Sequence, residues 1–533
     1  MVNPGIRRHA IILAHTEPLA KEADVSYMEY ILPMKGCFVL HRRFAYLGHY
    51  IARHLKDRKS VQEFCGIVYT KPSLDFITAQ TDIEYGTLLY DEEIHARYKT
   101  EKLDPAYLDA LEKEYGLPSL WPYLAVDRII MSNQLVREYP HDWPRYSHED
   151  MLRLLQVYAK AVTEFLDKER PDFVFFSAIC TTSSFLLYHM AKKRGIQTLV
   201  VQMASTKNRY IVGETYDSFT GVDELFHGDR SALANLPERK EAETFLREFR
   251  ERPTPYYDKS TPTQQPVGRH RQFRFLNPRY GLGTARVLLN NLREHFSRTH
   301  KDEYSYIGPW TYFKDASKRK LRNFIGLNDL YDEFTPKQDD FVFFPLHLEP
   351  EIALLLQAPF QTDQVNLIRQ IARSLPVHHK LYVKDHPEMA QYRPRSFYKA
   401  IKRNPNVKLI DASISSFHIT PHAKLITTIT GSVGWEALMF KKPVITFGHV
   451  FYNSLPMTTF CDRMEQLPLI IKERLAHDLH DEEELVSFLT ALFKDSAELN
   501  LHHLWMDEPS FERKMDGVKP LADALAKKIR PLG

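Results

Sequence analysis

Three clusters of polar side chains in the second half of the sequence carry groups that could bind a phosphate and move a proton. In chain order these residues are His347, Glu349, Glu351, Lys384, His386, Gly431, Ser432, Gly434 and Glu436. The lysine and the imidazole of His386 can neutralise a phosphate or protonate a leaving group. Glu349 and Glu351 can accept a proton or bind sugar hydroxyls. These residue types suit a site for an anionic ligand.

The third cluster lies where an apolar, strand-like run becomes helix-like. Gly431 and Gly434 would allow a tight turn, and we expect Ser432 to be the N-cap of the helix that follows. A helix N-terminus presents free N–H groups and a partial positive charge, which suits a phosphate. A carboxylate at Glu436 would repel a phosphate, so we expect it to bind a ribose diol. A plain helix cap would explain the same serine and glycines.

The elements that must position these clusters alternate regularly from residue 340 onward. Apolar runs predict strands at 341–346, 380–384, 407–410, 424–429 and 444–447, with helical patterns between them. Such alternation is typical of a parallel, doubly wound α/β sheet. Ligands bind at the carboxyl ends of the strands in these sheets, so we expect the three clusters to share one crevice.

The first half of the sequence carries similar but less regular units. We expect strands at 9–14, 172–177 and 198–202, with helices at 149–168 and 185–194. The chain is long enough for two large domains. The predicted segments are a first α/β domain at 1–251, a linker and basic helical segment at 252–335, a second α/β domain at 336–490, and C-terminal helices at 491–533 that pack back on the first domain.

Composition narrows the class of protein. The chain has 44% apolar and 26% charged residues, as in ordinary water-soluble globular proteins. No stretch predicts a membrane span, and the apolar run at 10–14 is too short for a signal peptide. The four cysteines show no metal-binding spacing, so we expect a reducing cytoplasm, no metal and no cofactor. A P-loop and the H-E-x-x-H pattern are absent, and the glycines at 281–283 lack the third glycine of a dinucleotide fingerprint.

Basic charge is concentrated in residues 267–322, which hold 13 Lys or Arg against 4 Asp or Glu, a local net charge of +9 in a chain of +3. Aromatic residues are interleaved with these charges. The segment could contact anionic lipid headgroups or an acidic glycan, and a solvated helix pair between domains would explain it equally well. We expect no nucleic-acid partner, because no recognisable nucleic-acid-binding module accompanies the charge.

Residues 344–351, 383–387, 430–438 and 442–448 resemble, in order and spacing, the capsule polysaccharide biosynthesis family, which includes Kdo-transferring capsule enzymes. The resemblance implies an α/β fold of the GT-B type, in which two Rossmann-like doubly wound domains face each other across a cleft. It also implies that the donor nucleotide binds the C-terminal domain and the acceptor the N-terminal domain. By similarity, His386 and Ser432 would contact the donor phosphate without a metal.

The resemblance leaves the catalytic base open. His15 and Glu17, in the loop after the strand expected at 9–14, compete with Glu349 and Glu351, and Glu351 is the favoured candidate. On the same acceptor side, Lys207 and Arg209 could bind an anionic acceptor, although exposed loop charges would look the same.

The hypothesis is a cytoplasmic glycosyltransferase of bacterial capsule or surface-polysaccharide synthesis, at the inner face of the inner membrane. It would use a nucleotide sugar, CMP-Kdo-like in preference, and a glycan or lipid-linked acceptor. The alternatives are a teichoic-acid-like polyol-phosphate transferase with a CDP donor, a sugar-nucleotide epimerase that needs no acceptor, and a non-catalytic assembly protein of the same fold.

Overall fold

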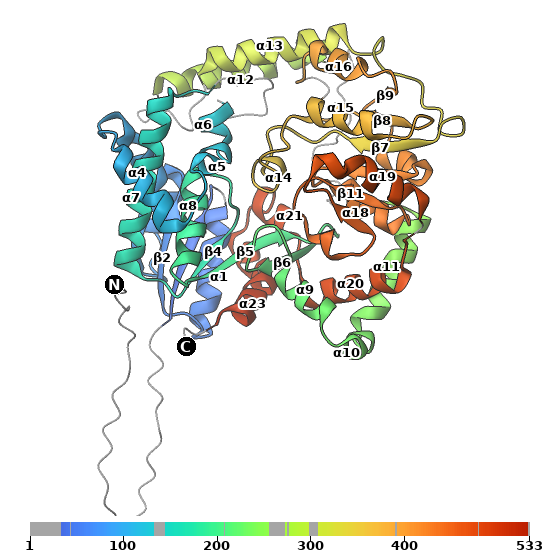
Figure 1. The fold of residues 1–533 in the computed structure, drawn as a ribbon. Helices are drawn as coiled ribbons and strands as arrows, with labels where there is room; N and C mark the ends of the chain where they lie inside the picture. Colours follow the sequence, from blue (N-terminus) through green and yellow to red (C-terminus); the bar gives the residue numbers. More distant parts are fainter. Residues whose placement is uncertain are drawn as a thin grey trace, which may run out of the picture. The chain divides into compact units, whose positions relative to one another are not determined.

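The computed structural model describes residues 34–533 except 43, 133–143, 207, 255–271, 274–276, 298–307, 390–391, 478 and 531–533. The predicted strand at 9–14, with His15 and Glu17 after it, lies outside the described residues, as does Lys207. Figure 1 shows the ribbon, in which two β-sheets organise the described part of the chain.

The first sheet has the strand order β13-β6-β5-β4-β1-β2-β3. Its strands are β1 (Lys35–Leu40), β2 (Glu63–Val68), β3 (Tyr85–Tyr90), β4 (Phe173–Phe176), β5 (Gln197–Met203), β6 (Arg209–Gly213) and β13 (Ala497–Glu498). Strands β1 to β5 pair in parallel, whereas β6 and β13 add an antiparallel edge. The parallel part has the 3-2-1-4-5 order of a Rossmann unit, with β1 beside β4 at the point where the order reverses.

The second sheet is parallel throughout, in the order β12-β11-β10-β7-β8-β9. Its strands are β7 (Phe341–Pro345), β8 (Lys380–Lys384), β9 (Val407–Ile410), β10 (Leu425–Thr428), β11 (Val444–Thr446) and β12 (Thr458–Phe460). Numbered from β7, this is the doubly wound order 3-2-1-4-5-6, which reverses between β7 and β10. The two sheets confirm the predicted fold class of two Rossmann-like units.

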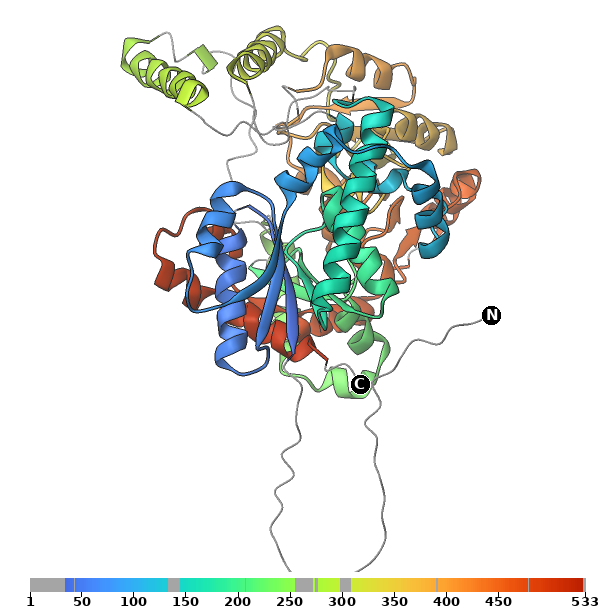
Figure 2. The same ribbon diagram turned by 90° about the vertical axis from the view of Figure 1, so that its left-hand side faces the viewer.

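Helices cover both sheets (Figures 1 and 2). Those before β7 are α1 (Phe44–Asp57), α2 (Lys71–Thr78), α3 (Asp91–Ala96), α4 (Pro105–Tyr115), α5 (Trp121–Ala125), α6 (Arg128–Ser132), α7 (His148–Glu169), α8 (Thr182–Lys193), α9 (Thr220–His227), α10 (Arg230–Ala234), α11 (Glu238–Glu251), α12 (Pro278–Ser297) and α13 (Pro309–Ile325). Those after it are α14 (Ile352–Leu355), α15 (Gln364–Ser374), α16 (Arg395–Lys402), α17 (Ser416–Ile419), α18 (Ser432–Met439), α19 (Leu467–Ala476), α20 (Glu482–Asp495), α21 (Leu501–Met506), α22 (Phe511–Gly517) and α23 (Lys519–Lys528).

The strands of the second sheet could be predicted from the sequence because they are buried. All five residues of β7 are buried, and its side chains enter the apolar cores on both faces of the sheet. A strand covered on both faces is a continuous apolar run, with no polar alternation to obscure it. The helical pattern expected between the strands at 341–346 and 380–384 is broken between α14 and α15, where Pro359 cannot continue a helix.

Each apolar core contains residues from more than one of the segments predicted from the sequence. Helices α9 to α11 belong to the segment 1–251, yet their apolar side chains share a core with β7 and α18 of the second sheet. Helices α21 to α23 pack against α1 and the first sheet, and β13 pairs with β6. The chain therefore leaves the first sheet, builds the second and returns to the first.

Candidate active site

A pocket of about 970 Å³ opens where strands of both sheets end. Ser177 and Ile179, after β4, line it from the first sheet. His347, Lys384 and Gly431, after β7, β8 and β10, line it from the second. The loops after β4, β7 and β10 adjoin the points where the strand orders reverse, which is where open α/β sheets bind ligands. The structure thus brings the three polar clusters together.

The turn between β10 and α18 is stabilised by a hydrogen bond from Tyr452. Gly431, rather than Ser432, is the N-cap of α18, so the predicted cap is wrong by one residue. The hydroxyl of Tyr452 donates to the carbonyl oxygen of Gly431 at 2.7 Å. A side chain on Gly434 would clash with that hydroxyl, so any larger residue there would have to displace Tyr452. Ser432 and the next residue, Val433, line the pocket, so the helix N-terminus faces the space where an anion would bind.

Lys384 supplies a buried cation at the end of β8. Its ammonium group donates to the carbonyl oxygens of Asp385, at 3.0 Å, and Ala412, at 3.2 Å. Burial lowers the pKa of Lys384 to about 8, while the charges of Asp385, Asp411 and Glu436 oppose that shift. The group is therefore protonated at neutral pH, although less completely than an exposed lysine.

Glu436 lies close enough to Lys384 for their charges to interact, and it is also buried. Burial raises the pKa of Glu436 to about 8, with only partial opposition from Lys384. Among the described residues, its Oε2 atom has no hydrogen-bond partner, and the residue lines the pocket. At pH 7 the carboxyl group is mostly protonated, so the repulsion of a phosphate expected from the sequence is largely absent.

His347 supports the turn rather than offering a charge. Its Nε2 atom accepts the backbone N–H of Thr430 at 3.2 Å, and its own backbone N–H donates to Gln364 at 2.7 Å. Burial, followed by the charge of Arg393, lowers the pKa of His347 to about 3. The neutral imidazole joins the loop after β7 to the turn after β10.

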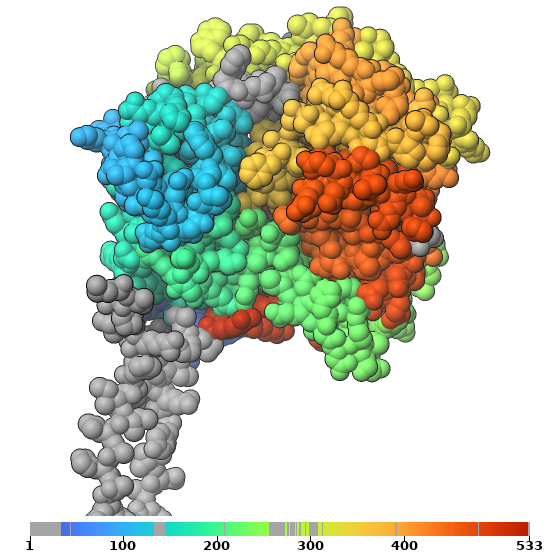
Figure 3. All heavy atoms as spheres, in the orientation of Figure 1, coloured from blue at the N-terminus to red at the C-terminus, as the bar shows by residue number. Residues whose placement is uncertain are grey.

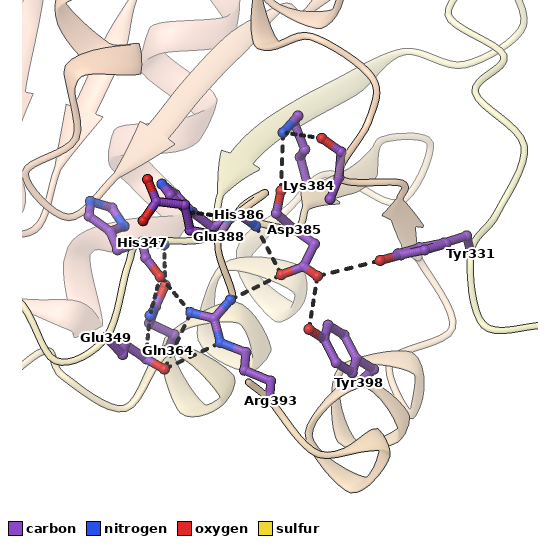
Figure 4. Close-up of polar contacts among 11 residues, drawn as sticks. Tyr331, His347, Glu349, Gln364, Lys384, Asp385, His386, Glu388, Arg393 and Tyr398 are labelled. Carbon is purple, nitrogen blue, oxygen red and sulfur yellow. Dashed lines mark hydrogen bonds and ion pairs between the residues drawn. The ribbon is translucent and has the colours of Figure 1, made fainter. Parts of the chain in front are cut away.

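Arg393 organises the site and was missed by the sequence analysis (Figure 4). This buried guanidinium donates to Asp385 at 3.0 Å, to Glu349 at 3.3 Å and to the carbonyl oxygen of His347. Asp385 also accepts the hydroxyl of Tyr398 at 2.8 Å. One arginine thus ties the loop after β7 to the loop after β8, and the run of Arg and Pro at 393–395 was the only sequence signal for it.

This network separates the two candidate bases. Glu349 is buried, bonds to Arg393 and Gln364 and does not line the pocket, so its catalytic role stays a prediction that these contacts do not favour. Burial raises the pKa of Glu349, and Arg393 opposes the shift. Glu351 is exposed, lines the pocket and immediately precedes α14.

His386 lies in the pocket lining as predicted. Its backbone N–H donates to Asp385 at 2.9 Å, and its Nδ1 atom accepts the backbone N–H of Glu388 at 3.2 Å. With Nδ1 accepting a hydrogen bond, a neutral imidazole would carry its proton on Nε2. Arg393 therefore fixes the position of His386 through Asp385.

Of the residues predicted on the acceptor side, the structure describes Arg209. Arg209 lies on β6, donates to Glu241 and to the hydroxyl of Ser496 at 3.0 Å, and covers the ring of Phe493 at 4.5 Å. Arg209 is absent from the pocket lining and its partners lie elsewhere in the protein, so its role in binding an acceptor stays a prediction. Gln202 is one of the residues of the first sheet that line the pocket instead.

The sequence analysis also missed His41, which lies with Tyr69 and Cys180 at the carboxyl edge of the first sheet. His41 follows β1, its ring stacks on Tyr69 at 3.8 Å, and its Nε2 atom lies 3.3 Å from the sulfur of Cys180. Burial, with a smaller effect of Arg42, lowers the pKa of His41 to about 3. The signal in the sequence was the apolar run 36–40 ending at a histidine.

The described residues contain no group of three or more His, Cys, Asp or Glu placed to hold a metal ion. Within the same residues, no helix is both long and apolar enough to cross a bilayer.

The part of the chain that contains the second sheet is similar to a known protein family. Residues 238–464 match the family model described as capsule polysaccharide biosynthesis protein, which confirms the resemblance for this part of the chain. Protein FixF of Sinorhizobium fredii (strain NBRC 101917 / NGR234) is 30% identical over 145 residues, which is 26% of this chain and 35% of that protein. The match thus spans about a third of the relative.

The chain also has low overall similarity to several solved structures. The beta Kdo 2,4 transferase of Thermosulfurimonas dismutans KpsC aligns with a TM-score of 0.34 and 15% identity, covering 67% of this chain and 88% of that one. The UDP-GlcNAc 2-epimerase of Neisseria meningitidis, bound to UDP-GlcNAc, aligns with a TM-score of 0.23 and 10% identity, covering 86% of this chain and 98% of that one.

Proposed function

We propose that the protein is a glycosyltransferase of capsule or surface-polysaccharide synthesis. It would transfer a sugar from a nucleotide donor, CMP-Kdo-like in preference, to a glycan or lipid-linked acceptor. The observation that carries the proposal is the pocket, in which a buried cation, a helix N-terminus and a buried carboxyl group meet at the end of the second sheet. The family match over residues 238–464 supports the same function.

The donor phosphate would bind between Lys384 and the N-terminus of α18. Lys384 uses two ammonium hydrogens on backbone carbonyls, and the described residues leave the third for a ligand. The open Oε2 of Glu436 suits a hydroxyl of the ribose or, when protonated, an oxygen of the phosphate. The site would therefore recognise the charge and the ribose of a nucleotide together.

The reaction would proceed with Glu351 as the base. Glu351 would take the proton of the acceptor hydroxyl while the acceptor oxygen bonds to the anomeric carbon of the donor sugar. The bond from that carbon to the phosphate oxygen breaks, and its electron pair leaves with the nucleotide. Lys384, His386 and the N-terminus of α18 would stabilise the charge that develops on the phosphate.

The test is a calorimetric titration of the purified protein with CMP, CDP, UDP, GDP and TDP. We expect one nucleotide, CMP, to bind selectively, and Ser432→Ala and His386→Ala to weaken that binding. His378→Ala is the matched control, because this histidine is exposed and away from the pocket. With a donor and an acceptor, His386→Ala should reduce turnover while leaving the circular dichroism spectrum unchanged.

The other outcomes identify the alternatives. Selective binding of CDP would favour a polyol-phosphate transferase, and conversion of a UDP-sugar without acceptor would favour an epimerase. The absence of binding to every nucleotide would contradict the proposal and favour a non-catalytic assembly protein.

A further inference from the structure

Helix α13 presents large apolar side chains to solvent. Trp310 is 83% exposed, Phe313 is 58% exposed, and Leu321 and Phe324 are each 60% exposed. At 3.6 residues per turn, these four positions fall within an arc of about 80°. They lie along one side of the helix, with the exposed Ser317 between Phe313 and Leu321, and we call these four side chains the outer stripe. At one end of it, Phe324 also contacts the ring of Phe273 at 6.1 Å.

The opposite face of α13 is polar and faces the protein. Arg319 donates to the hydroxyl of Tyr392 at 3.2 Å, and Arg322 donates to the carbonyl oxygen of the same residue. Asp315, on that side of the helix, is only 4% exposed. A surface helix of a globular protein normally buries its apolar face and exposes its polar face. In α13 the arrangement is reversed.

Lysines flank the outer stripe. Lys314 and Lys318 lie on one side of it and Lys320 on the other, when positions are advanced by about 100° per residue. Asp315 is the one acidic residue of α13, and it is turned inward. An apolar stripe with two exposed lysines along one side and a partly buried lysine along the other has the complementary chemistry of an anionic bilayer surface.

Helix α12 repeats the pattern. Leu289, Leu292 and Phe296 are exposed and lie at intervals of three and four residues. Arg286 and Arg293 are exposed close to them on the helix surface. In Figure 2 both helices lie at the top, and in Figure 3 their yellow-green atoms lie along the upper edge.

We propose that α12 and α13 dock on the surface of an anionic bilayer, with the outer stripe in the headgroup region and the flanking lysines on lipid phosphates. A second copy of the chain is a poorer occupant, because lysine is depleted in the cores of protein interfaces. The proposal is independent of the nucleotide site, so either can fail without the other.

The experiment is co-sedimentation of the full-length protein with lipid vesicles. One set of vesicles is phosphatidylcholine, and the other is phosphatidylcholine mixed with phosphatidylglycerol. We expect binding to the anionic vesicles, weaker binding in high salt, and a loss of about tenfold or more in the double variant Trp310→Ser/Phe313→Ser. Lys314→Glu/Lys318→Glu should also weaken binding. Phe360→Ser is the matched control, because Phe360 is 89% exposed but lies outside both helices.

Three readouts decide the outcome. Tryptophan emission should shift to the blue on binding, and Trp310→Phe should remove that shift. Circular dichroism and nucleotide affinity should be unchanged in the stripe variant, since its side chains are exposed. Equal vesicle binding by the wild type and the stripe variant would overturn the proposal, as would a wild-type dimer that the stripe variant converts to a monomer in sedimentation analysis.

Discussion

At the scale of single residues, the pocket depends on two buried groups whose pKa values are shifted in opposite directions. Burial lowers the pKa of Lys384 and raises that of Glu436, both to about 8. Below that pH the pair is an ammonium and a neutral carboxyl, and above it the pair is an amine and a carboxylate. The net charge of the pair therefore falls from +1 to −1 as the pH rises through about 8.

Nucleotide binding should therefore weaken as the pH rises through about 8. Each lost proton removes one unit of positive charge beside the bound phosphate, and a charge-assisted hydrogen bond is worth enough to change affinity by about tenfold. Calorimetric titrations at neutral and alkaline pH measure the effect. Glu436→Gln, which is neutral throughout, should bind at neutral pH and show a shallower pH dependence. A profile identical to that of the wild type would exclude Glu436 as a titrating group.

Arg393 should be the residue of the site that matters most for stability. Replacing it by Met leaves Asp385 and Glu349 buried without their shared cation, and breaking such a buried pair costs about 3–5 kcal/mol. Chemical denaturation measures the loss. Arg395→Met, two residues away, is the control, because Arg395 pairs with Asp329 at the surface. Equal denaturation midpoints for the two variants would mean that Arg393 does not anchor the loops.

At the scale of elements, the N-terminus of α18 depends on the close contact between Gly434 and Tyr452. Gly434→Ala should displace the Tyr452 hydroxyl, weaken nucleotide binding and reduce the free energy of unfolding by about 1–3 kcal/mol. The double variant Gly434→Ala/Tyr452→Phe removes the closest clashing atom and should restore part of the stability. Gly283→Ala, in α12, has open space around it and should not destabilise the protein. A Gly434→Ala variant with the nucleotide affinity and the free energy of unfolding of the wild type would contradict this account.

Much of the second sheet could be predicted from the sequence, because its buried strands are short apolar runs between helical patterns. The residues 380–384 and 407–410 are strands in the structure as predicted. Strands β1, β2 and β3 of the first sheet were missed. Strand β3 is only partly buried and lacks a clear apolar run, whereas β1 and β2 are buried almost throughout. The distinction between Glu349 and Glu351 was out of reach because it depends on Arg393, whose contacts span up to 46 residues. Long-range pairs of this kind leave no local pattern.

At the scale of the whole molecule, the last three helices are part of the first core. Leu521 and Leu525 are fully buried there, together with α1 and the first sheet. Leu521→Ala and Leu525→Ala should each reduce the free energy of unfolding by about 2–5 kcal/mol. Leu469→Ala should have little effect, because Leu469 is exposed. Denaturation curves that show no loss for the buried pair would mean that these helices are not part of the cooperative unit.

The return of the chain to the first sheet also sets an order of assembly during synthesis. Roughly 300 residues separate β6 from α23, so at a translation rate of about 5–20 residues per second the wait is tens of seconds. Throughout that time the apolar side of α1 has emerged from the ribosome without the helices that cover it. The second sheet can meanwhile close around its own strands. The sheet encoded first is therefore completed last, and the nascent chain exposes a surface that a chaperone would recognise.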